Sequence, residues 1–191
     1  MALALPVLVA VVVGLALGGS LANLTRLELR APWLFLAAVG LQLVAFPLTL
    51  FPWETDETVA SALWVASYGL LIVAATLNVR ITGVPIVAAG MLLNLAAIVV
   101  NRGTMPVRLE AMQDAGRVDV VRANSTAMPD PSLPWLVDRW AAPDWVPLAN
   151  VFSVGDVVIA LGTFWLVLAA TGVSRGSDSS RATSSTSVSS G

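Results

Sequence analysis

The sequence predicts an all-α polytopic membrane protein, a bundle of five transmembrane helices with one long extracytoplasmic loop. The first observation is composition, because 57% of the 191 residues are hydrophobic, only 12% are charged, and the mean hydropathy is +0.84. A soluble domain is typically about 45–50% apolar and about 25% charged. The second observation is that the apolar residues fall into long runs near the roughly 20 residues that span a bilayer core. The excess apolar surface therefore indicates lipid as the surrounding solvent.

Two absences narrow the chemistry that the chain can perform. It contains no Cys and no His, and every basic residue is Arg. Disulfides, thiolate chemistry, Ser-His-Asp hydrolysis, haem held by His and the usual zinc sites are therefore excluded. The net charge of -2 gives no reason to expect nucleic acid as a partner. The carboxylates Glu110, Asp114 and Asp119 match no EF-hand spacing, so we expect no metal site and no cofactor.

The apolar runs place the five helices within one transmembrane domain, residues 1–172. A cleaved signal peptide would have basic residues before the first apolar run. No Arg or Lys precedes this run, so we expect a retained helix. Pro32 lies at the start of the second run, where a helix tolerates proline, and Trp33 follows at the expected interface depth. The predicted helices cover residues 3–22, 33–51, 59–78, 84–101 and 151–172.

The long loop, residues 102–150, is the main polar segment between helices. It carries Trp135, Trp140 and Trp145. Because Trp favours the membrane–water interface, the loop is expected to lie on the membrane surface, and anchoring of a partner protein is the alternative. Two short amphipathic patterns lie within the loop, one around Leu109 and the other around Leu136.

The Arg residues of the short segments predict the orientation. Arg26, Arg30 and Arg80 lie in the links after the first and third helices, and Arg175 and Arg181 lie in the tail. The positive-inside rule places these segments in the cytoplasm and the N-terminus outside. The five Arg of the long loop oppose this assignment, although six acidic residues accompany them. The tail, residues 173–191, is rich in Ser and Thr and predicts disorder. The use of Arg without Lys, together with the many Ala and Val residues, indicates a GC-rich bacterial genome, and we expect the protein in the bacterial plasma membrane.

Asn94 and Asn101 are candidate site residues because a polar group in hydrocarbon is costly unless it is paired. They lie seven residues apart, on one face of the fourth predicted helix. Hydrogen bonding between helices explains both, and a polar ligand cavity is the alternative.

Arg102 and Asp156 flank the long loop and are expected near the same membrane boundary. Ionisable residues at membrane depth are functional candidates. However, Ser153 and Asp156 have the spacing of a capping box before an apolar run, where the helix dipole favours an acid. We therefore expect a helix cap, with which an ion pair to Arg102 is compatible. A ligand-binding or proton-transfer role for Asp156 is the alternative.

Two short motifs carry a resemblance to a known family. One is Asn101-Arg-Gly-Thr-Met105-Pro106-Val, which fits N-x-G-x-M-P-V, and the other is Phe152-Ser153-Val-Gly-Asp156, which fits F-S-x-G-D. The chain resembles a family of uncharacterised bacterial integral membrane proteins, a domain of unknown function, across residues 1–172. The resemblance implies no activity, substrate or cofactor. It does imply that the two motif regions meet at the outer membrane face, and it adds Met105 and Pro106 to the candidate residues.

Three functional hypotheses remain from the sequence. The first is a non-enzymatic envelope protein whose outer loop contacts lipid, a small ligand or a membrane partner. That partner is either another membrane protein or a second copy of the chain. The second is a small transporter or channel subunit with a polar site near Asn94, Asn101, Arg102 and Asp156. The third is a membrane enzyme that acts on lipid-linked substrates, although no catalytic constellation is present. Convergence of the polar side chains on one cavity would favour the second hypothesis over the first.

Overall fold

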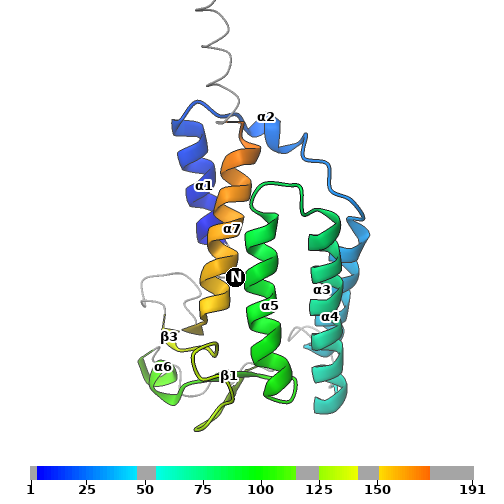
Figure 1. Cartoon of the computed structure of the whole chain (residues 1–191), viewed down its shortest axis with the longest axis vertical. Coiled ribbons are helices and arrows are strands. Elements are labelled where there is room, and N and C mark those ends of the chain that lie inside the picture. Colours follow the sequence, from blue (N-terminus) through cyan, green and yellow to red (C-terminus); the bar gives the residue numbers. More distant parts are fainter. Residues whose placement is uncertain (1–3, 47–54, 115–124, 142–150, 173–191) are drawn as a thin grey trace, which may run out of the picture.

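The computed structural model describes residues 4–46, 55–114, 125–141 and 151–172, and these are mostly helical, as the composition predicts. The long helices pack in the spatial order α1, α7, α5, α4, α3, so that the last helix lies between the first and α5 (Figure 1). These helices are α1 (Ala4–Ala16), α3 (Trp33–Ala45), α4 (Glu57–Leu77), α5 (Val84–Val100) and α7 (Val154–Ala170).

The bundle has two unlike ends (Figure 1). At one end lie the short helix α2 (Leu21–Leu24), the turn between α4 and α5, and the C-terminus of α7; we call this the turn end. At the other end lie α6 (Leu109–Asp114), β1 (Met105–Val107) and β3 (Trp140–Ala141); we call this the loop end.

The first two helices are shorter than the apolar runs that predict them. Helix α1 ends at Ala16 rather than near residue 22, because Gly18 adopts a φ of 85° and turns the chain. Ser20 then caps α2 with its hydroxyl, which accepts a hydrogen bond from the Ala22 N–H. Helix α3 ends at Ala45, and the rest of the range predicted for it, from residue 47 on, lies outside the described residues.

The described part of the loop end contains two small sheets. Strand β1 pairs in parallel with β2 (Ser125–Ala127), and β3 pairs antiparallel with β4 (Val151–Phe152). The Asp138 N–H donates to the Pro106 carbonyl at 3.0 Å, and the Arg108 N–H donates to the Asp138 carbonyl at 3.0 Å. These backbone hydrogen bonds join segments about 30 residues apart, so the described part of the loop folds against itself.

Only one of the two amphipathic patterns in the loop is helical. The first contains α6. The second forms a turn and a β-bridge instead, because Leu133 adopts a φ of 54° and the Leu136 N–H donates to the Leu133 carbonyl. Leu136 is still buried, and it packs with Met105 against Ala97 and Ile98 of α5.

Four glycines bring α5 and α7 close together. Gly90 faces Gly155, and Gly83, the N-cap residue of α5, faces Gly162, so two pairs of glycines seven residues apart meet at the contact. A Cβ added at Gly90 would lie 2.6 Å from the Gly155 carbonyl oxygen. Small residues at a helix interface allow the backbones to approach closely. This packing fixes the position of the start of α7 beside the middle of α5.

Helix length supports a membrane span for one helix. Among the described residues, α4, with 21 residues, is the helix both long and apolar enough to cross a bilayer, by length and composition alone. The other four long helices are apolar but have 17 residues or fewer. The prediction of five transmembrane helices is therefore not confirmed by helix length.

Candidate functional site

Asn94, Ser153 and Asp156 form one hydrogen-bonded group, which we call the polar cluster. Asn94 Nδ2 donates to Asp156 Oδ1 at 2.9 Å. The Ser153 hydroxyl lies 2.9 Å from Asn94 Oδ1 and 3.1 Å from Asp156 Oδ2. Because a hydroxyl has one proton, it can donate to only one of these oxygens at a time. The three side chains thus satisfy one another between α5 and α7.

The same side chains begin helix α7. The Ser153 hydroxyl accepts from the Asp156 N–H at 3.1 Å, and Asp156 Oδ2 accepts from the Ser153 N–H at 3.0 Å, which is a complete capping box. The carboxylate also lies in the first turn, where the helix dipole favours negative charge. The structure therefore gives both residues the cap that their spacing predicts.

Gly155 makes room for Asn94. A Cβ added at Gly155 would collide with the Asn94 side chain amide, and it would lie 2.9 Å from the Gly90 carbonyl oxygen. Asn94 is 3% exposed and Ser153 is fully buried. Tyr68 of α4 lies near Asn94 and Asp156. The polar cluster thus lies where α4, α5 and α7 meet, with Asn94 and Ser153 buried and Asp156 half-buried.

Arg102 lies apart from this cluster. Its side chain is exposed, and no ion pair joins it to Asp156, although the structure describes both residues. Arg102 instead occupies the position after the helix α5 cap with a φ of 60°, and the next residue, Gly103, donates its N–H to the Ile98 carbonyl at 2.8 Å. This is a Schellman ending of α5, and it leaves the Arg102 side chain exposed.

Asn101 ties the loop to α5. Its side chain Nδ2 donates to the Ala97 carbonyl at 2.7 Å and to the Ser132 carbonyl at 2.9 Å, and its Oδ1 accepts from the Ser132 N–H at 2.9 Å. Asn101 is 3% exposed, so the Asn101 side of these bonds is shielded from water. One side chain thus satisfies a helix end and both backbone groups of a residue 31 positions away.

Asn78 makes the same arrangement at the turn end. Its Nδ2 donates to the Ala74 carbonyl at 2.8 Å and to the Arg30 carbonyl at 2.9 Å, and its Oδ1 accepts from the Arg30 N–H at 2.7 Å. We call Asn78 and Asn101 the two asparagine latches. The sequence prediction missed Asn78. A shared signal exists, since each Asn ends a helix and follows a fully buried Ala by four residues.

Met105 and Pro106 are part of the loop core. Both are buried, and the Pro106 carbonyl accepts the hydrogen bond from the Asp138 N–H. Met105 packs against Ala97 and Ile98 of α5. The structure therefore places these two residues in packing roles, near Asn101 but in a different group from the polar cluster.

The seven candidate residues fall into three groups rather than one site. Asn94, Ser153 and Asp156 make the polar cluster, Asn101, Met105 and Pro106 hold the loop, and Arg102 faces outward. Within the described residues, no three acidic side chains gather into a candidate metal site.

A comparison with models of protein families gave a match for this chain. The model of DUF5317, a family of unknown function, matches residues 26–168. This range includes every candidate residue from Asn94 to Asp156. The predicted resemblance to a family of unknown function is thereby confirmed. Comparisons with curated proteins and with solved structures gave no match.

Proposed function

The chain belongs to the DUF5317 family of unknown function, and we propose from its own residues that it is an integral, non-enzymatic membrane protein whose latched loop end contacts the lipid interface. In this proposal all five long helices cross a bacterial plasma membrane. The N-terminus and the loop end lie outside, and the tail lies in the cytoplasm, as the Arg distribution favours.

Exposed apolar side chains on every long helix support the membrane assignment. Leu8 of α1 is 60% exposed, Leu36 of α3 75%, Val59 of α4 50%, Leu92 of α5 52% and Leu161 of α7 59%. A monomeric soluble protein rarely exposes apolar surface over so many elements. In addition, α5 and α7 have 17 residues each, a rise of roughly 25 Å, close to the roughly 30 Å of a bilayer core.

The hydrogen bonds between Asn101 and Ser132 are the main support for the proposed role of the loop end. Asn101 holds Ser132 at two backbone atoms, which positions the neighbouring segment relative to the bundle. On that held segment Trp135 is 56% exposed and Trp140 is 40% exposed, with the Arg139 guanidinium 5.2 Å from the Trp140 ring centroid. Trp and Arg together suit the headgroup region of a bilayer.

The hydrogen bonds of the polar side chains within the bundle favour a structural role for these side chains over a transport pathway. Gln42 donates to the Ser67 hydroxyl at 3.1 Å, the polar cluster is satisfied by its own members, and Asn101 bonds to backbone atoms. These partners lie within the protein and leave the polar side chains in separate groups. Their separation supports the non-enzymatic membrane protein over a channel subunit.

The test begins with extraction of membranes at alkaline pH, which should leave the protein in the pellet. Hydrogen exchange is then compared between lipid nanodiscs and detergent. We expect residues 132–141 to be more protected in nanodiscs, and replacement of Trp135 and Trp140 by Ser to abolish that difference. Release of the wild-type protein by alkali would refute the membrane assignment.

The two latches supply a matched pair of variants for the same measurement. Asn101→Ala removes the bonds to Ser132 and should raise exchange at the loop end about tenfold, as loss of about 1.4 kcal/mol of protection implies. Asn78→Ala removes the equivalent bonds at the turn end and should leave the loop end unchanged. Equal effects of the two variants on the loop would contradict a local latch.

A further inference from the structure

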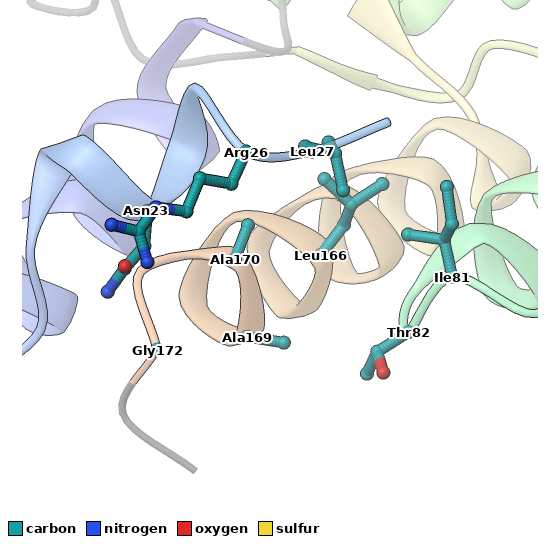
Figure 2. Close-up of a pocket in the computed structure, with 9 residues that line it drawn as sticks. All are labelled: Asn23, Arg26, Leu27, Ile81, Thr82, Leu166, Ala169, Ala170 and Gly172. Carbon is teal, nitrogen blue, oxygen red and sulfur yellow. The ribbon is translucent and has the colours of Figure 1, made fainter. Parts of the chain in front are cut away.

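A groove opens at the turn end between α2, the α4–α5 turn and the last turns of α7 (Figure 2). Its volume is about 160 Å³, far above the roughly 15 Å³ that one water molecule needs. The groove is open on one side rather than enclosed. It therefore has room for a phosphate-sized group together with the start of a hydrocarbon chain.

The lining of the groove is polar on one side and apolar on the other. Figure 2 shows the Arg26 side chain extending toward Asn23, while Leu27, Ile81 and Leu166 lie away from them. Asn23 is held in place, because its Nδ2 donates to the Thr171 carbonyl at 2.9 Å. A fixed amide and a cation thus face one part of the groove, and branched aliphatic side chains face the other.

Arg26 is available to a ligand. Its side chain is exposed, and within the described chain it has no ion-pair partner. The other charged residues described at this end are Glu28, Arg30 and Arg80, so positive charge is in excess there. An anion is therefore the complementary ligand for the polar side of the groove.

We propose that this groove binds an anionic phospholipid from the leaflet at the turn end, an inference that rests on the proposed membrane function. The Arg26 guanidinium would hold the phosphate, since its planar fork matches phosphate oxygens. One acyl chain would run along Leu27, Ile81 and Leu166. Leu166 lies one helical turn before Ala170, about 6 Å deeper toward the bilayer centre. Basic pockets between transmembrane helices on the cytoplasmic side bind anionic headgroups in this way.

A lipid fits this groove better than a small soluble anion does. Inorganic phosphate would use the polar side and leave Ile81 and Leu166 in contact with water. A phospholipid satisfies both sides at once, because its phosphate and its chain are joined at the spacing of headgroup and hydrocarbon. The apolar side of the groove is what distinguishes the two ligands.

The test measures lipid binding to the purified full-length protein in detergent by native mass spectrometry, with thermal unfolding as a second readout. Phosphatidylglycerol should bind and raise the unfolding temperature, and phosphatidylcholine should bind more weakly. Arg26→Gln should lower the affinity for phosphatidylglycerol about tenfold, the loss expected for one hydrogen-bonded charge. Arg30→Gln is the matched control, since Arg30 lies at the same end but does not line the groove, and it should bind as the wild type does.

Three further comparisons distinguish a phospholipid from a small anion as the ligand of the groove. Arg26→Lys should fall between wild type and Arg26→Gln, because it keeps the charge and loses the fork. Inorganic phosphate should give no comparable stabilisation, and Ile81→Ser should weaken lipid binding. Equal binding of both lipids, equal loss in the Arg26 and Arg30 variants, or full stabilisation by phosphate alone would overturn the proposal.

Three additional results would each lead to a different conclusion. Lipid binding that appears only after removal of residues 173–191 would make that segment the occupant and would overturn the lipid assignment. A protein that alkali releases from membranes refutes the proposed membrane function. A protein that stays in membranes yet does not distinguish the two lipids refutes only the groove.

Discussion

At the scale of single residues, the structure assigns Asp156 to Asn94 and Ser153 rather than to Arg102. Asp156→Ala should therefore destabilise the protein by about 1–3 kcal/mol, because it removes the Asp156 half of the capping box and leaves the Asn94 amide and the Ser153 N–H without an acceptor. Arg102→Gln should change stability by less than about 0.5 kcal/mol, as exposed substitutions usually do. Thermal or chemical unfolding in detergent measures both effects.

The double variant decides whether Arg102 and Asp156 interact. Because the structure places no ion pair between these two described residues, their effects should add within about 0.5 kcal/mol. A larger coupling energy would mean that the two residues form the ion pair that their positions at the two ends of the loop suggest.

At the scale of elements, the glycines of α5 and α7 set how closely the two helices approach. Gly90→Ala would place a Cβ 2.6 Å from the Gly155 carbonyl oxygen, and backbone cannot move aside as a flexible side chain can. Overpacking of this kind costs about 1–3 kcal/mol. Gly69→Ala on α4 is the control, since a Cβ there meets nothing within 4 Å, and it should be neutral or stabilising by up to about 1 kcal/mol. Equal unfolding temperatures for the two variants would contradict the tight contact.

Some features of these helices could be predicted from the sequence, and others could not. Apolar runs predicted where helices lie, and the spacing of Ser153 and Asp156 predicted the α7 cap, because both depend on neighbouring residues. The early end of α1 depends on the left-handed conformation of Gly18, which apolar periodicity does not register. The contact of Asn101 with Ser132 and the pairing of Gly90 with Gly155 require knowledge of which segments meet. The seven-residue spacing of the glycines is visible in each helix, but a single helix does not identify its partner.

At the scale of the whole molecule, the proposed membrane function predicts which end of the bundle faces each side of the membrane. The chain has no Cys, so single-cysteine variants can be labelled without background. Ser132 at the loop end and Glu28 at the turn end are both exposed. With the loop outside, Ser132→Cys should react with a membrane-impermeant maleimide in intact cells, and Glu28→Cys should react only after permeabilisation.

A third variant tests whether lipid covers the exposed sides of the bundle. Leu161 of α7 is 59% exposed, and a cysteine there would react readily if water surrounded the helix. Within a bilayer it should stay unlabelled in both intact and permeabilised cells and should react only in detergent or denaturant, because thiolate formation requires water. Labelling of Leu161→Cys in intact membranes would mean that α7 faces water. The exposed apolar surface would then need a protein partner rather than lipid to cover it.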